Sequence, residues 1–453
     1  MCADNESNLY EFVIFCKKLL TFGRKIDIIC SYWVFSAQSA ANKFFIIILW
    51  RKTMKKTLSL ILAVLMLLSV TLAFASCGDA NADFKVGFIF LHDENSTYDK
   101  NFIDAANAAC AALGLTADQI IMKVNIPEGS ECYDAACELV DDGCDLIFAD
   151  SFGHEDFMIQ AAKEFPDVQF CHATGTKAHT EKLANYHNAF ASIYEGRYVA
   201  GIVAGMKLNQ MIADGKITAE QAVIGYVGAW PYAEVKSGYT SFFLGARSVC
   251  PTATMKVEYT NSWFDIALEK TAAEKLIGDG CVLISQHADS EGAPKACDAA
   301  GVPNVAYNIS TKDIAPNTWL ISSKINWEPY MKLIIEKTRD GKGNEIPYDW
   351  CGGIEEGSVQ LTELNTALAA PGTQEAIDAA IAAFKAGTLK VFDTATFTVG
   401  GQKLESYMAD VDSDAAFTPD TEVIKDGYFN ESADGLRSAP YFDLIIDGIT
   451  AAQ

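Results

Sequence analysis

Short apolar segments alternate with amphipathic segments along the chain from residue 84 onward. Five nearly all-apolar segments come first, at 84–90, 120–126, 144–150, 168–174 and 186–192. Five more follow a long helical segment, at 222–229, 254–261, 281–288, 302–308 and 319–325. Strands are nearly all apolar when helices cover both faces of a parallel sheet. The pattern therefore predicts an α/β protein with two doubly wound parallel-sheet lobes.

The order of these segments also predicts how the lobes are joined. Residues 84–192 and 326–345 are assigned to the first lobe, because a helical segment after the tenth strand returns the chain to it. Residues 193–325 and 346–453 form the second lobe with a less regular C-terminal extension, in which a strand pair is predicted within 387–401. Ligands of such sheets bind beyond the carboxyl ends of the strands. Two facing lobes therefore predict a ligand cleft between them and a hinge.

An export signal precedes the first lobe. Two lysines and an apolar run from Leu58 to Ala75 give residues 54–76 the form of a secretory signal peptide. Ala75 and Ser76 lead directly into Cys77, an arrangement that resembles a bacterial lipobox, in which the cysteine is acylated. The alternative is a transmembrane helix, but about 18 residues is near the lower limit for a span, and the flanks favour a signal peptide.

The residues around this signal complete the expected layout. A signal peptide belongs at the N-terminus, so residues 1–53 are expected to be a spurious extension, with a membrane anchor as the alternative. Residues 77–83 are a short tether. Without residues 1–76, the net charge of −24 becomes about −29. This acidity argues against a nucleic-acid partner, whose phosphates require a basic surface.

Nine cysteines follow Cys77 in the sequence, an odd number for an exported protein with a full set of disulfides. Most of them lie within apolar helix or strand patterns, where a free cysteine behaves as a small hydrophobe. We interpret them as buried thiols. A metal site at Cys132, Cys137 and Cys144 is the alternative, but these spacings do not match a zinc knuckle.

Five sequence segments together resemble the basic membrane protein (BMP) family of ABC-importer solute-binding lipoproteins, over residues 84–360. They are DSFGHEDFMIQAAKEFPDVQFCHATG at 150–175, YEGRYVAGIVAGM at 194–206, GYVGAWPYAEVKSGYTSFFLGARSV at 225–249, NSWFD at 261–265 and DGCVLISQHADSEG at 279–292. The resemblance implies a periplasmic-binding-protein type I fold and a purine nucleoside or purine base as ligand. NSWFD and QHADS are closer to the purine-base subgroup than to the nucleoside branch.

The resemblance also implies site residues. Tyr98 and Trp263 occupy the positions of two stacking aromatics, one in each lobe, and Asp99 matches a polar position that bonds ligand. Lys324 matches a family lysine, and Trp327 fits the purine-base subgroup. A flat base needs aromatic faces for stacking and a few polar groups at its edge, which agrees with these assignments.

Other candidates follow from their positions at strand ends. Phe152 follows the third strand and either packs under the ligand or touches it. His287 and Asp289 follow the eighth strand and are expected to hydrogen-bond a purine edge. Asn308 ends the next strand, where nucleoside binders of the family carry an aspartate. Glu195 and Arg197 of the EGRY segment are expected to form a hinge pair or to contact the ligand.

These observations predict an extracellular, lipid-anchored solute-binding protein that closes its lobes around a purine base or nucleoside, with an adenine-like base favoured. Its partner would be a separate ABC permease. We expect no catalytic residue, no metal and no cofactor, and a monomer. A sugar-binding protein of the same fold is the alternative. A nucleoside-processing enzyme is less favoured, because the sequence has no GxSxG, P-loop or HExxH motif.

Overall fold

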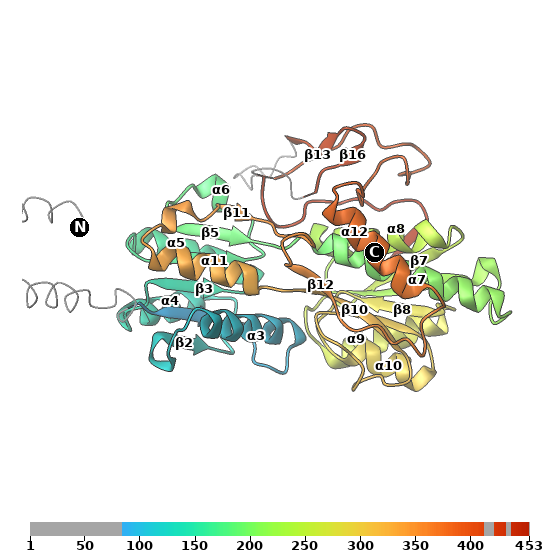
Figure 1. Ribbon diagram of the computed structural model, residues 1–453, viewed down its shortest axis with the longest axis horizontal. Coiled ribbons are helices and arrows are strands. Elements are labelled where there is room, and N and C mark those ends of the chain that lie inside the picture. Colours follow the sequence, from blue (N-terminus) through green and yellow to red (C-terminus); the bar gives the residue numbers. More distant parts are fainter. Residues whose placement is uncertain (1–83, 412–420, 432–435, 453) are drawn as a thin grey trace, which may run out of the picture. The chain divides into compact units, whose positions relative to one another are not determined.

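The computed structural model describes residues 84–411, 421–431 and 436–452, all within one compact unit that begins at Asn81. The predicted N-terminal extension, the signal peptide, Cys77 and the tether lie outside the described residues. Two separate sheets with helices on both faces dominate this unit (Figure 1). They confirm the predicted pair of doubly wound α/β lobes.

The first sheet is parallel throughout and has the strand order β11-β5-β4-β3-β1-β2. In that order its strands are β11 (Asp349–Trp350), β5 (Tyr186–Ala189), β4 (Gln169–Ala173), β3 (Leu146–Ala149), β1 (Val86–Ile89) and β2 (Ile120–Lys123). Its helices are α3 (Thr97–Ala112), α4 (Ser130–Asp141), α5 (Glu155–Glu164), α6 (Ala178–Glu181) and α11 (Glu328–Arg339).

The apolar character of these strands follows from burial on both faces. In β1, Phe88 packs in the cluster with Phe102 of α3, whereas Ile89 packs with Leu139 of α4 on the opposite face. Alternate residues of a strand point to opposite faces, so every position of β1 is buried. Helix α11 returns to this lobe as predicted, with Tyr330 against Phe148.

The second sheet has the order β12-β10-β9-β8-β6-β7-β17, and β12 is its one antiparallel strand. In that order the strands are β12 (Val359–Leu361), β10 (Trp319–Ile325), β9 (Asn304–Tyr307), β8 (Leu283–Gln286), β6 (Val223–Gly228), β7 (Thr254–Tyr259) and β17 (Ile449–Ala451). Its helices are α7 (Ile193–Ala213), α8 (Ala233–Val249), α9 (Ile266–Gly278), α10 (Gly292–Ala300) and α12 (Thr373–Lys385).

Helices α7 and α8 approach each other closely, and two glycines make this possible. A Cβ added to Gly201 would lie 2.0 Å from the Phe242 carbonyl, and one added to Gly245 would lie 2.0 Å from the Tyr198 carbonyl. This contact holds α7 against α8. Helix α7 enters this lobe from the first lobe, and the N-terminus of α8 faces the cleft. Helix α12 lies beside α7 (Figure 1).

Two details of the C-terminal part differ from the sequence prediction. The prediction ended the first lobe at residue 345, but the first sheet also contains β11, which extends to Trp350 and pairs with β5. The strand pair predicted within 387–401 is wrong. The two-stranded pairs are instead β13 (Met408–Ala409) with β14 (Thr421–Glu422), and β15 (Ile424–Lys425) with β16 (Tyr428–Phe429). The apolar residues of the predicted pair serve packing: Phe392, for example, stacks on Phe442 at 4.5 Å.

Candidate ligand-binding cleft

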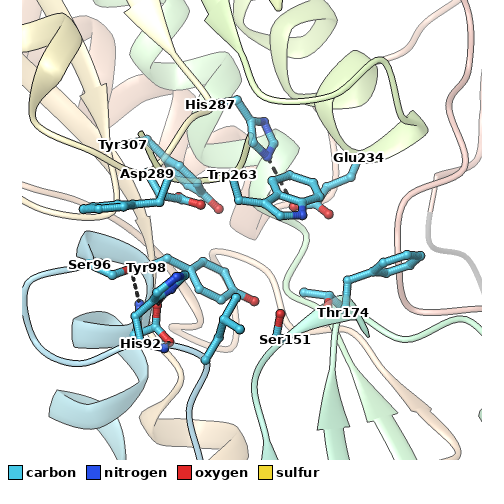
Figure 2. Close-up of a pocket in the computed structure, with 14 residues that line it drawn as sticks. His92, Ser96, Tyr98, Ser151, Thr174, Glu234, Trp263, His287, Asp289 and Tyr307 are labelled. Carbon is cyan, nitrogen blue, oxygen red and sulfur yellow. Dashed lines mark hydrogen bonds and ion pairs between the residues drawn. The ribbon is translucent and has the colours of Figure 1, made fainter. Parts of the chain in front are cut away.

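A cleft of about 470 Å³, including space open to solvent, lies between the carboxyl edges of the two sheets. The first lobe contributes Leu91, His92, Ser96, Tyr98, Asp99, Ser151, Phe152 and Thr174. The second contributes Glu234, Trp263, Phe264, His287, Asp289 and Tyr307. Figure 2 shows the labelled side chains of the two lobes converging from opposite sides. Six of the predicted ligand residues therefore meet in one place: Tyr98, Asp99, Phe152, Trp263, His287 and Asp289.

Tyr98 is held in the wall of the first lobe by a hydrogen bond and an aromatic stack. Its hydroxyl donates to the Asp150 carbonyl at 2.7 Å. Its ring packs edge-on against Phe102 at 4.9 Å, and Phe102 stacks on Trp327 at 4.3 Å. Tyr98 thus presents an aromatic face to the cleft from a rigid, apolar support.

Asp99 is buried beside Tyr98 and organises the loop after β1. One carboxylate oxygen accepts from the His92 backbone N–H at 2.7 Å, and the other lies 3.2 Å from His92 Nδ1. Burial opposes the charge, but the hydrogen bonds from His92 and Ser96 prevail and hold the pKa of Asp99 below its usual range. The hydrogen bond with Asp99 in turn raises the pKa of His92. Asp99 is therefore an ionised acceptor whose oxygens already have local donors.

Trp263 faces Tyr98 from the second lobe, on the loop between β7 and α9. Asp265 ends this loop as the N-cap of α9 and accepts from the N–H groups of Ala267 and Leu268, both at 2.9 Å. Asn261 begins the NSWFD segment with a φ of 55°, in the left-handed region. The cap and the turn together set the direction of the indole, which is half-buried in the wall of the cleft.

A buried cation lies behind this wall. Arg197 is 1% exposed, and its Nη1 donates to the Tyr226 hydroxyl and the Gln286 carbonyl, both at 2.8 Å. Its guanidinium carbon lies 3.8 Å from the centre of the Tyr307 ring. Nη2 lies 3.2 Å from His287 Nδ1. Arg197 thus acts on the cleft through His287 and Tyr307, and it does not line the cleft itself.

The contact with Arg197 determines the protonation of His287. Arginine can only donate, so Nδ1 of His287 is the acceptor and the ring proton lies on Nε2. Nε2 lies 3.2 Å from Glu234 Oε1 and donates to it. Burial, followed by the charge of Arg197, lowers the pKa of His287 to about 4. The imidazole is therefore neutral at pH 7.

Asp289 and Asn308 form the remaining polar pair of the second lobe. Asn308 Nδ2 donates to Asp289 Oδ1 at 3.1 Å, and burial raises the pKa of Asp289 well above its usual range. The Thr97 hydroxyl donates to the Asp289 carbonyl at 2.6 Å, which joins the two lobes across the cleft. Asn308 supports the site through Asp289 but does not line the cleft. Its φ of 67° and that of Thr174 at 70° place strained backbone at two strand ends.

Three more predicted residues lie away from the cleft. Trp327 is 1% exposed because it fills the space beneath Phe102. Lys324 lies on β10 and pairs in register with Gln360 of β12, the strand at the edge of the sheet. Glu195 accepts from the Ile354 N–H at 2.7 Å, so it links two of the segments that pass between the lobes, and burial raises its pKa to about 7. The contact lies where a hinge would be, and the hinge role of Glu195 stays a prediction.

The sequence interpretation missed eight residues that line the cleft. They are Leu91, His92, Ser96, Ser151, Thr174, Glu234, Phe264 and Tyr307. Most of them stand directly at or after the carboxyl end of a predicted strand, and Glu234 belongs to the WPYAE turn after β6. The rule that ligands bind at these ends would have found them if it had been applied to every strand.

The described residues contain no group of three or more His, Cys, Asp or Glu side chains arranged to hold a metal ion. The nine described cysteines form no disulfide with one another, and seven of them are buried; they are Cys110, Cys132, Cys137, Cys144, Cys171, Cys250, Cys281, Cys297 and Cys351. Within the same part of the chain, none of the helices has both the length and the apolar character needed to cross a bilayer.

Comparison with known proteins agrees with this geometry. Residues 89–385 match the family model of the Bmp, or PnrA-like, ABC transporter substrate-binding proteins. A purine-binding protein of Brucella abortus is 34% identical over 301 residues, which cover 65% of this chain and 80% of the relative. A putative ABC transporter glucose-binding protein of Haloferax volcanii is 36% identical over 219 residues, covering 48% of this chain and 52% of the relative.

Solved structures show the same fold at lower identity. A solute-binding protein of an ABC transporter from Conexibacter woesei superposes with a TM-score of 0.55 at 20% identity, covering 68% of this chain and 98% of its own. One from Aeropyrum pernix gives a TM-score of 0.56 at 15% identity, covering 68% and 93%. These likenesses confirm the periplasmic-binding-protein type I fold.

The chain therefore belongs to the Bmp family of ABC transporter substrate-binding proteins. Proteins of this class bind a small molecule outside the membrane and work with a permease. The resemblance noted in the sequence is confirmed.

Proposed function

We propose that this protein captures a purine base or nucleoside, with an adenine-like base favoured, between Tyr98 and Trp263. The observation that carries the proposal is the pair of aromatic side chains that face each other from different lobes of one cleft (Figure 2). A base stacked between them would draw the lobes together, and the closed form would be the one presented to the permease. The purine-binding relative from Brucella abortus supports this choice of ligand.

A sugar is the second candidate ligand, because the Haloferax volcanii relative is described as a putative glucose-binding protein. Sugars also stack on aromatic rings and bond to carboxylates. Titration calorimetry of the purified protein with adenine, guanine, adenosine, inosine, glucose and ribose would separate the two. Binding of sugars alone would contradict the purine assignment, and turnover of a nucleoside would contradict a function limited to binding.

Replacement of Trp263 by alanine tests the stacking directly. Loss of one stacked aromatic costs about 1–3 kcal/mol per base, so we expect adenine affinity to fall by about 5- to 150-fold. Trp319→Ala is the matched control, because Trp319 lies at the amino end of β10 in the same sheet and does not line the cleft. An adenine affinity that is equal in the wild type and in Trp263→Ala would show that the indole does not stack on the base.

We further propose that the protein is anchored to the outer face of the cell membrane through lipid on Cys77. The lipobox-like sequence before Cys77 supports this proposal. Metabolic labelling with a radioactive fatty acid should label the wild type, and Cys77→Ser should abolish the label and release the protein from the membrane fraction. Labelling that persists in Cys77→Ser would refute the proposed anchor.

A further inference from the structure

Stacking between two rings does not explain why a cation is buried behind the cleft. Among the described residues, Arg197 has no carboxylate as a direct partner and instead bonds to Tyr226, Gln286 and His287. Burying a charge is costly unless its surroundings compensate. A buried arginine is therefore expected to have a role beyond packing. Its partner His287 contacts Glu234, which lines the cleft.

The order of donors runs in one direction, from Arg197 to the cleft. Arg197 donates to Nδ1 of His287, and Nε2 of His287 donates to Oε1 of Glu234. The side chain of His287 is 2% exposed and is shielded from water, whereas that of Glu234 is 18% exposed and borders the cleft. Oε2 of Glu234 has no hydrogen-bond partner among the described residues. One acceptor oxygen is thus left available in a fixed position in the wall.

Neither lysine nor arginine occurs among the lining residues that the structure describes, so neither of these cations competes for Glu234 from within the wall. The oxygens of Asp99 already face His92, which leaves Glu234 as the carboxylate with an available oxygen. That oxygen favours a ligand N–H group. A carbonyl oxygen placed against Glu234 would be repelled, because a carboxylate offers it no donor.

We infer that Arg197 and His287 hold Glu234 as the acceptor for an exocyclic amino group, so that the cleft prefers 6-amino to 6-oxo purines. This inference rests on the proposed purine-binding function and adds the residue that would set its selectivity. Glu234 is the contact residue, and Arg197 and His287 are positioning residues. A site built to bond a donor rejects an analogue that lacks it, because its own polar group is then left unpaired.

Calorimetric titration with adenine and hypoxanthine tests the inference, because adenine carries an amino group at the position where hypoxanthine carries an oxo group, together with a proton on the neighbouring ring nitrogen. We expect the wild type to bind adenine at least about 10-fold more tightly, and Glu234→Gln to reduce that ratio about 10-fold, since an amide can also donate to a carbonyl. Glu258→Gln is the control: Glu258 lies on β7 of the same lobe and pairs with Lys275, so the ratio should not change.

Each outcome separates the inference from the function on which it rests. If the wild type binds neither base, the purine assignment fails, and this inference fails with it. If the wild type binds bases but Glu234→Gln leaves the ratio unchanged, even with both affinities lowered, Glu234 has only a structural role and the inference alone fails. As a measurement that needs no variant, ¹⁵N NMR at pH 7 should show neutral His287 with its proton on Nε2; a proton on Nδ1 would overturn the proposed chain.

Discussion

The two walls of the cleft are supported in opposite ways. In the first lobe, Tyr98 rests on Phe102 and Trp327, an aromatic stack inside the apolar core. In the second lobe, a buried cation, Arg197, holds His287 and lies over Tyr307. Tyr98 is positioned mainly by packing, with one hydrogen bond to the Asp150 carbonyl, whereas His287 is positioned by directed hydrogen bonds.

This difference in support predicts that the two lobes contribute differently to ligand affinity and ligand selectivity. Packing fixes a ring plane but is indifferent to which polar groups the ligand carries. Hydrogen bonds from a permanent cation fix the donor and acceptor roles of the groups they reach. The first wall can therefore supply affinity through stacking, while the second can supply selectivity. The three changes below test this contrast, from the largest expected effect to the smallest.

Trp327→Ala removes the base of the aromatic stack. Trp327 is 1% exposed, and replacing a buried tryptophan by alanine typically costs about 3–5 kcal/mol. We expect the free energy of unfolding in urea to fall by this amount, and adenine affinity to fall as Tyr98 loses its support. The ratio of adenine to hypoxanthine affinity should stay constant. A changed ratio would show that selectivity also depends on the first wall.

Arg197→Met removes the cation of the second wall while keeping an unbranched apolar side chain. The Gln286 carbonyl, the Tyr226 hydroxyl and Nδ1 of His287 lose their donor, so we expect the free energy of unfolding to fall by about 2–4 kcal/mol. Here the ratio of adenine to hypoxanthine affinity should also fall. Arg197→Lys keeps the charge but not the planar fork and should recover only part of both losses. Full recovery by lysine would mean that charge alone matters.

The pH dependence of stability tests His287. Its folded-state pKa is lowered to about 4, whereas an exposed histidine has a pKa near 6.5. The unfolded chain therefore binds the proton first, and the stability contributed by neutral His287 is fully present above about pH 6.5 and is lost as the pH falls toward 4. His287→Asn should reduce the slope of unfolding free energy against pH by about 1 kcal/mol per pH unit at pH 5 to 6.

A histidine of the first lobe provides the comparison for this measurement. Burial also lowers the pKa of His154 to about 4, so His154→Asn should change the slope in the same direction. Only His287→Asn should also change ligand selectivity. Equal slopes in the wild type and in His287→Asn would mean that His287 is protonated in the folded protein, contrary to the donor order of the second wall.

Much of the fold could be predicted from the sequence, because strands that are buried on both faces of a sheet appear as short, nearly all-apolar segments. All ten strands from β1 to β10 lie within the predicted apolar segments. Short strands at the sheet edges, such as β11 and β17, have no such apolar segment. β11 contains two residues and β17 three, and both exist because a neighbouring strand offers unpaired backbone groups. Their positions depend on tertiary contacts that no local pattern records.

The site divides in the same way. The family resemblance pointed to Tyr98 and Trp263, and the position after a strand pointed to His287 and Asp289; all four line the cleft. The sequence could not distinguish Trp327 from the residues that line the cleft, because a tryptophan buried in the core and one that stacks on a ligand are identical in the sequence. Nor could it assign Arg197, whose role depends on Gln286 and His287, nearly ninety positions away.

The sequence by itself determined that two parallel-sheet lobes form, where their strands lie and which family the chain resembles, because apolar periodicity and short motifs are local properties. Only the tertiary structure decided which side chains meet. Contacts such as Thr97 with Asp289, or His287 with Glu234, join residues that are far apart in the sequence and close only when both sheets and their helices have packed. The chemistry of the cleft therefore depends on geometry created by the fold as a whole.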